Sequence, residues 1–172
     1  VGASGLIGSQ LVQLLVEHPY YTEVLLLVRK PLANLHSKVQ QLIINFDNLN
    51  EYATSIQGDA IFSCLGTTRN KTPETVQYKK VDMDYPLEIA QIGLLNGVKQ
   101  FHIITSLGAN ATSSNPYLKL KGELENELKK LPYQSIHIYQ PSYLVGERTE
   151  NRIGDKILEP LMRLIDPLLI GN

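Results

Sequence analysis

The chain has 172 residues, of which 43% are hydrophobic and 19% charged, a balance typical of a folded globular protein and unlike a disordered chain. The formal net charge of -1 offers no basic surplus for binding nucleic acid or an anionic membrane. The single cysteine, Cys64, excludes an internal disulfide and a cysteine-based zinc cluster. No apolar run approaches the roughly 18 residues of a membrane span. We expect one cytoplasmic domain over residues 1–172, and the oligomeric state stays open.

Short apolar runs alternate with longer amphipathic segments along the chain. We expect helices over residues 6–17, 84–96, 116–131 and 155–170, shorter helical segments over 48–55 and 73–80, and strands over 23–28, 41–45, 60–65, 100–106 and 135–140. This alternation predicts an α/β fold, a doubly wound (Rossmann-like), mostly parallel sheet with helices on both faces.

Both ends of the sequence are abrupt for such a sheet. Val1 would be the last residue of the first, central strand, and we expect that strand to precede it. Residues 141–172 would begin a lid over the substrate, and we expect the natural chain to run further. The apolar segment 155–170 could also form a dimer surface or an amphipathic membrane helix, and packing in the lid is the favoured reading.

The opening segment VGASGLIGSQ places three glycines where the predicted first strand meets the first helix. Free N–H groups and the helix dipole attract anions at such a helix start. Gly2 would permit the tight turn, Gly5 the close approach of a diphosphate, and Gly8 the packing of helix on strand. The alternative is a glycine-rich turn without a ligand, but the helix and buried strand that follow favour nucleotide binding. The residues predicted to contact the cofactor here are Gly2, Ser4, Gly5, Leu6, Ile7 and Gly8.

The strand over 23–28 runs out into Arg29 and Lys30. At this place a carboxylate would accept hydrogen bonds from the adenosine ribose of NAD(H). A guanidinium instead favours the 2′-phosphate of NADP(H), which it binds through paired hydrogen bonds. The alternative is a solvated basic turn. The sequence therefore predicts NADP(H) in preference to NAD(H).

Tyr117 and Lys121 stand four residues apart in the predicted helix, so they share one helix face. Ser106 closes the strand before this helix, at the sheet edge that faces the ligand in open α/β folds. Ser106 would hydrogen-bond a substrate carbonyl, Tyr117 would donate the proton as hydride arrives, and Lys121 would stabilise the tyrosinate and orient the cofactor. The alternative is a pair of surface residues on a charged helix.

The segments GASGLIG, CLGTT, TSLGA, YLKLKGELE and QPSYLVGER together resemble the atypical short-chain dehydrogenase/reductase family. Within it, the chain is similar to the NAD(P)H-binding branch of the HIV Tat-interacting protein and its bacterial relatives. The resemblance implies an NADPH-binding Rossmann fold, a site formed by Ser106, Tyr117 and Lys121, and an adenine contact from Asp47. It also implies cofactor contacts from two loops, through Cys64, Leu65, Gly66, Thr67, Pro141, Ser142 and Leu144.

The sequence departs from the family pattern at one helical position. Many short-chain dehydrogenases have an asparagine there, and this chain offers Asp82, so the resemblance does not carry over a proton relay through asparagine. We predict an enzyme that reduces a small carbonyl substrate. The first alternative is an NADPH-sensing binding protein with a protein partner and little turnover. A nucleotide-sugar epimerase is a weaker one, because it would need a larger C-terminal domain.

Other polar residues are assigned no chemistry. The four histidines lack metal-ligand spacing, so no metal site is predicted. Cys64 is expected to be a packed small side chain in preference to a nucleophile. The charges of GELENELKK are expected to form a solvated helix face with Glu-to-Lys pairs.

Overall fold

The computed structural model describes residues 1–68, 71–142 and 144. By its internal contacts the chain divides into two units, Val1–Ser142 and Tyr143–Asn172, and every element named below lies in the first. In chain order these elements are α1 (Leu6–Glu17), β1 (Val24–Val28), β2 (Val39–Ile43), the 3-10 helix η1 (Phe46–Ser55), β3 (Ala60–Ser63), α2 (Thr75–Lys79), the π-helical turn η2 (Lys80–Asp84), α3 (Tyr85–Leu95), β4 (Gln100–Ile104), α4 (Pro116–Leu128) and β5 (Ser135–Tyr139).

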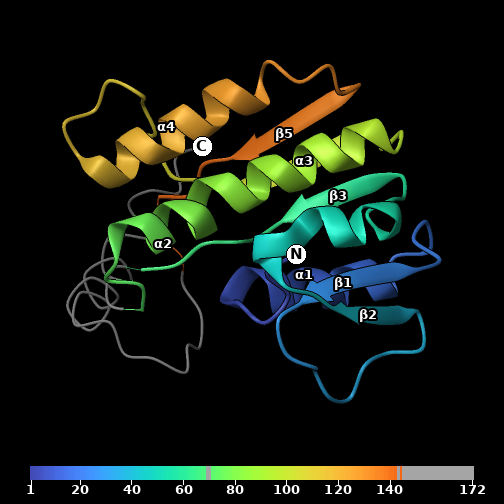
Figure 1. The fold of residues 1–172 in the computed structure, drawn as a ribbon. Helices are drawn as coiled ribbons and strands as arrows, with labels where there is room; N and C mark the ends of the chain where they lie inside the picture. Colours follow the sequence, from blue (N-terminus) through green and yellow to red (C-terminus); the bar gives the residue numbers. More distant parts are fainter. Residues whose placement is uncertain (69–70, 143, 145–172) are drawn as a thin grey trace, which may run out of the picture. The chain divides into compact units, whose positions relative to one another are not determined.

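The described strands run parallel in two groups. β1 pairs with β2, and β4 pairs with β3 on one side and β5 on the other. Each consecutive pair is joined through a helical or loop crossover, as Figure 1 shows. Parallel strands covered on both faces are expected to be continuous apolar runs, and this is the pattern that predicted them. β1, β3, β4 and β5 lie within their predicted ranges and are up to two residues shorter, whereas β2 starts and ends two residues earlier than predicted.

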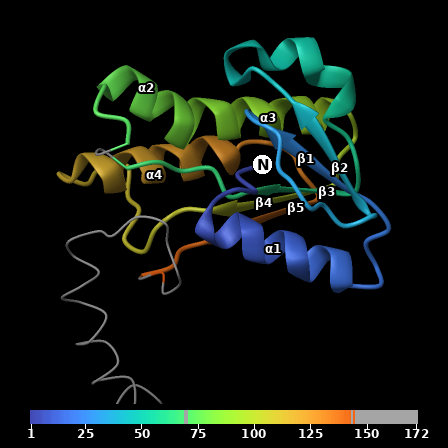
Figure 2. The same cartoon turned by 90° about the horizontal axis from the view of Figure 1, so that it is seen from below.

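Helices cover both faces of this arrangement. Figure 2 shows α1 on one side of the strands, with α3 and α4 on the other. On the α3 and α4 side, Leu49, Ile89, Phe101 and Leu124 are fully buried. On the α1 side a smaller cluster gathers around Leu26. The predicted doubly wound α/β fold with helices on both faces is therefore confirmed.

A groove of about 640 Å³ lies between β1 and β3. At its end the Val1 amino group donates to the Phe62 carbonyl (2.8 Å), and the Cys64 N–H donates to the Val1 carbonyl (3.1 Å). Val1 thus pairs with β3 in the manner of a parallel strand residue. The predicted strand ahead of Val1 stays a prediction.

The helical segments predicted over 73–80 and 84–96 form one continuous run. Helix α2 passes through the π-helical turn η2 into α3, and the residues at both junctions keep helical backbone angles. Pro86, whose ring leaves no N–H to donate, lies in the first turn of α3. Single π-helical turns inside helices occur frequently at functional sites, and this one holds Asp82. The helix predicted over 155–170 lies outside the described residues.

Candidate active site

The glycine turn ahead of α1 has no room for side chains at two positions. Gly2 has a φ of +79°, and a Cβ there would lie 2.5 Å from the Cys64 carbonyl. A Cβ at Gly8 would overlap the Gly2 carbonyl, so Gly8 allows α1 to pack on the turn. Gly5 is exposed and forms the N-cap. Gly2 and Gly8 therefore meet the steric demands that the sequence predicted, and the close approach of a diphosphate at Gly5 stays a prediction.

The start of α1 is open to an anion. No side chain caps it, and its first turn holds no acidic residue. Ser4 and Gly5 are exposed, whereas Leu6 and Ile7 are half-buried. The unpaired N–H groups of a helix start attract negative charge, so this turn fits a diphosphate.

The loop after β3 meets the glycine turn. The Cys64 carbonyl fills the space beside Gly2. Further along the same loop, the Thr67 hydroxyl lies 2.8 Å from that of Thr72. Burial raises the pKa of the Cys64 thiol, which disfavours the nucleophilic thiolate. The structure thus brings together two of the segments that were predicted to hold the cofactor.

Lys121 is buried in an ion pair with Asp82. Its Nζ lies 2.8 Å from Asp82 Oδ1, and the two side chains are 4% and 1% exposed. The other carboxylate oxygen, Oδ2, accepts the Thr67 N–H at 2.8 Å. Asp82 therefore joins the predicted catalytic lysine to the predicted cofactor loop. In the sequence, Asp82 stands out only because it replaces the asparagine of the family pattern, and no local signal indicates that it pairs with Lys121.

Tyr117 stands in the first turn of α4, one turn before Lys121. The helix begins at Pro116, and the Asn115 side chain caps it by accepting the N–H groups of Tyr117 (2.9 Å) and Leu118 (3.3 Å). Tyr117 is 36% exposed, so part of its surface is open to solvent, and access of a substrate to its hydroxyl stays a prediction.

The loop after β4 carries Ser106 and packs against α4. The Asn110 N–H donates to the Leu118 carbonyl at 3.0 Å. A Cβ at Gly122 would overlap the backbone of Asn110 and Ala111, so glycine at this position allows the loop to lie on the helix. The segment that follows Ser106 is therefore held on the helix that carries Tyr117 and Lys121.

The end of β5 continues to pair with the end of β4. The Leu107 N–H donates to the Pro141 carbonyl at 3.1 Å. This bond holds Pro141 and Ser142 beside the loop that contains Ser106. Leu144 belongs to the second unit, and its cofactor contact stays a prediction.

One charge assigned to a solvated helix face is buried. Glu125 is 4% exposed and accepts hydrogen bonds from Thr105 and Gln140. The prediction for GELENELKK is wrong at this position, because Glu125 stands four residues after the buried Lys121 and lies on the same buried face of α4. That spacing of four was the signal that could have found it.

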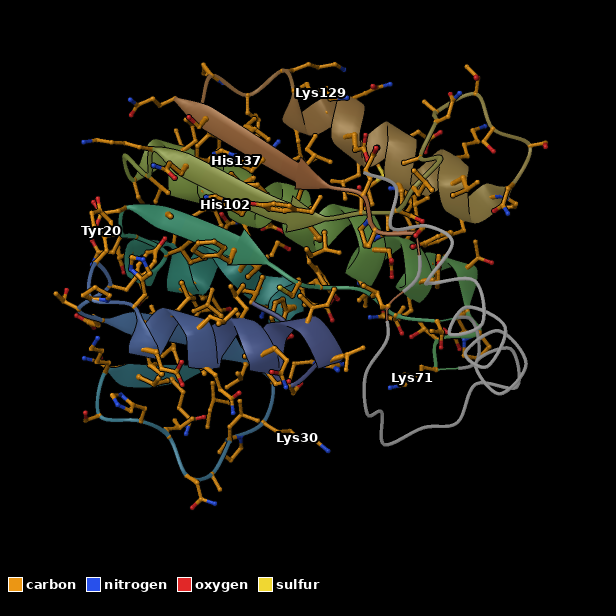
Figure 3. The ribbon with its side chains drawn as sticks, turned by 180° about the vertical axis from the view of Figure 1, so that it is seen from behind. Tyr20, Lys30, Lys71, His102, Lys129 and His137 are labelled. Carbon is orange, nitrogen blue, oxygen red and sulfur yellow. The ribbon has the colours of Figure 1, made fainter. Side chains whose placement is uncertain are left out.

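Arg29 and Lys30 are exposed directly after β1. Within residues 1–68, 71–142 and 144, neither forms an ion pair, and the Lys30 side chain points away from the ribbon in Figure 3. Asp47 differs, because its Oδ1 accepts from Lys80 (2.7 Å) and from the Tyr85 hydroxyl (2.8 Å). Both bonds lower the pKa of Asp47, and the bond from Lys80 has the larger effect. The adenine contact of Asp47 stays a prediction.

The strands, the crossovers and the glycine turn define a Rossmann-type α/β fold. Solved structures share it: Bordetella bronchiseptica WbmH in complex with NAD+ (TM-score 0.71, 16% identity, 94% of this chain and 60% of that chain) and Thermotoga maritima UDP-glucose 4-epimerase with UDP-glucose (TM-score 0.71, 18% identity, 87% and 56%). The chain belongs to the HIM1 family, whose model matches residues 29–165.

Two curated relatives place the chain more closely. It is 35% identical to Protein HTATIP2 of Rattus norvegicus over 159 residues, covering 90% of this chain and 65% of that relative. It is 34% identical to Protein FMP52, mitochondrial, of Candida albicans over 167 residues, covering 94% and 73%. The predicted family resemblance is confirmed.

The relatives leave the predicted cytoplasmic location untested. The FMP52 proteins are named mitochondrial. In the part of the chain that the structure describes, no helix combines the length and apolarity needed to cross a membrane. The same described part contains no group of three or more metal-ligating side chains that could hold an ion.

Proposed function

We propose that the chain is the cofactor-binding part of an NADPH-dependent oxidoreductase that reduces a small carbonyl substrate. The buried ion pair between Lys121 and Asp82 carries this proposal. One carboxylate holds both the lysine that follows Tyr117 by one helical turn and the Thr67 N–H of the predicted cofactor loop. Tyrosine chemistry and cofactor binding would therefore share one anchored site.

The residues of the chain would divide the reaction as follows. Bound NADPH would supply the hydride that adds to the carbonyl carbon. Ser106 would donate a hydrogen bond to the carbonyl oxygen, and Tyr117 would transfer its phenolic proton to that oxygen, so that an alcohol forms. The Lys121 ammonium would stabilise the resulting tyrosinate until solvent restores the proton.

Different observations support a nicotinamide cofactor in general and the preference for NADPH over NADH. A nicotinamide cofactor is supported by the glycine turn, which fits a diphosphate, and by the fold shared with WbmH, which was solved with NAD+. The preference for NADPH rests on Arg29 and Lys30, two exposed cations where the adenosine ribose is expected. The chain spans 65% of the length of rat HTATIP2. The reductase activity of the whole protein is therefore proposed and not shown.

The test separates binding from turnover. Tyr117→Phe removes the proton donor and keeps the ring, so we expect turnover to fall by at least about 100-fold. NADPH affinity should stay within about twofold, because the phenol is not needed to hold the cofactor. Fluorescence titration would give the affinity, and NADPH oxidation with a panel of small aldehydes and ketones would give turnover. Tyr20→Phe is the matched control, since Tyr20 is 73% exposed.

Full activity in Tyr117→Phe would exclude Tyr117 as the acid. Tight NADPH binding without turnover of any probe would favour the cofactor-sensing alternative. In that case NADPH should change which protein partners the chain recovers in a pull-down.

A further inference from the structure

Glu125 is a buried carboxylate that the proposed reaction does not use. Its side chain is 6% exposed, and Lys129, the cation nearest to it among described residues, is itself mostly exposed, with its Nζ 3.7 Å from Oε2. Burying a carboxylate is costly unless hydrogen bonds satisfy it. Glu125 must therefore be held by its other partners.

Two neutral donors, from two different strand ends, meet this carboxylate. The Thr105 hydroxyl donates to Oε1 at 2.7 Å, and the Gln140 side-chain amide donates to Oε1 and Oε2 at 2.9 and 3.1 Å. Thr105 directly follows β4, and Gln140 directly follows β5. Glu125 itself belongs to α4, so its carboxylate joins three elements.

Each partner stands beside a residue of the candidate site. Thr105 precedes Ser106, and Gln140 precedes Pro141 and Ser142. The two strand ends are also bonded to each other, since the Thr105 N–H donates to the Tyr139 carbonyl at 2.8 Å. The bonds to Glu125 tie both strand ends directly to the helix of the candidate site.

We propose that Glu125 is a positioning residue, which fixes the ends of β4 and β5 against α4 and so sets Ser106 and the Pro141–Ser142 segment in relation to Tyr117. The inference rests on the proposed reductase function for its catalytic consequence. Its geometric part stands independently of that function. A displacement of about 1 Å between reacting groups can cost about 100-fold in rate, so an anchor of this kind has a measurable effect.

The charge state of Glu125 matters because an ionised carboxylate only accepts hydrogen bonds, and both Thr105 and Gln140 donate to it. Glu125→Gln keeps the shape but replaces one acceptor oxygen with an NH₂ group, which would face the donors of Thr105 or Gln140. Thr105→Val removes one donor and keeps the volume. Thr105→Ser restores the hydroxyl. Glu127→Gln is the matched control on the same helix, because Glu127 is 42% exposed and pairs with Lys130.

Two measurements on the 172-residue chain test the proposal: hydrogen–deuterium exchange for the position of the strand ends, and steady-state kinetics for catalysis. Hydrogen–deuterium exchange should rise by about tenfold in residues 105–110 and 139–142 of Glu125→Gln, with α1 and β1 unchanged. With 4-nitrobenzaldehyde as the probe, kcat should fall by about tenfold or more, and the KM for NADPH should rise by less than that, because Pro141 and Ser142 are only two of the predicted cofactor contacts. Thr105→Val should act in the same way, and Thr105→Ser should recover most of the activity. The double variant Glu125→Gln/Thr105→Val should fall no further than Glu125→Gln.

Three results would overturn the proposal. They are wild-type exchange in Glu125→Gln, exchange raised evenly over the whole first unit, or fully additive losses in the double variant. Failure of the wild-type chain to reduce the probe would count against the proposed function alone, because the exchange pattern still decides whether Glu125 anchors the two strand ends.

Discussion

At the scale of single residues, the ion pair between Asp82 and Lys121 decides how the candidate site is held. A buried ammonium without a partner is strongly unfavourable, so Lys121 can stay buried beside η2 because Asp82 compensates its charge. The same carboxylate is bonded to Thr67, and its loss would also free the loop after β3. Asp82 thus both compensates the charge of Lys121 and holds the loop after β3.

A double-mutant cycle tests this coupling. We expect Asp82→Asn and Lys121→Met each to lower the free energy of unfolding by about 3 kcal/mol, because each leaves a buried group unpaired. The double variant should lose less than the sum, by at least about 1 kcal/mol. Urea unfolding would measure the three values. Asp84→Asn is the control, since Asp84 pairs with Lys79 at the surface and should cost less than about 1 kcal/mol. Additive losses in the cycle would show that the pair is not coupled.

At the scale of elements, the parallel register of β3, β4 and β5 creates a row of stacked rings. It places Phe62 opposite His102, and His102 opposite His137. The ring centroids are 4.4 and 4.3 Å apart, and Figure 3 shows the two histidines side by side. Burial, and then the charge of His137, lower the pKa of His102 to about 4.

This lowered pKa predicts how stability depends on pH. An unfolded histidine binds its proton near pH 6.5, whereas folded His102 binds it near pH 4. Between these values the unfolded state carries more protons, so the free energy of unfolding falls as pH is lowered. The contribution of one proton is at most about 1.4 kcal/mol per pH unit, and solvent screening reduces it. His102→Phe keeps the stack and should flatten the slope of the urea midpoint between pH 6.5 and 4.5. Equal slopes in variant and wild type would contradict the assignment.

The elements themselves were largely predictable from local patterns. Helix α1 matches its prediction because Gly5 and His18 bound a dense apolar run. The strands were predicted because parallel strands are apolar on both faces. The π-helical turn η2 was missed, since Asp82, Asp84 and Pro86 have the composition of a break and nothing local indicates a wider helical turn.

At the scale of the whole molecule, local motifs of the candidate site could be predicted from the sequence, whereas the contacts that join distant segments could not. Glycine spacing and the Tyr117–Lys121 interval are local, so the sequence carries them. The bond from Lys121 to Asp82 joins residues 39 positions apart, and that from Thr105 to Glu125 joins residues 20 apart. A single sequence has no local signal for such pairs, because they depend on how helices and strands pack. These are the contacts that a structure adds.

Cofactor preference can be measured through the stability of the whole fold. A ligand held only by the folded chain stabilises it by about 2.7 kcal/mol at a concentration of 100 times its Kd. We therefore expect NADPH to raise Tm more than NADH at equal concentration. Arg29→Ala combined with Lys30→Ala should weaken NADPH binding by about 10- to 100-fold, through lost charge-assisted hydrogen bonds to the 2′-phosphate. NADH binding should stay within about twofold, since NADH lacks that phosphate.

The control for this comparison is Lys99→Ala, because Lys99 is exposed next to the start of β4, away from the strand ends that carry Arg29 and Ser106. Its NADPH-dependent rise in Tm should equal that of the wild type. If the wild-type chain instead responded equally to both cofactors, Arg29 and Lys30 would be a solvated basic turn. The 2′-phosphate would then have no recognised partner at the end of β1, and the preference for NADPH would have to be abandoned while the nicotinamide assignment stood.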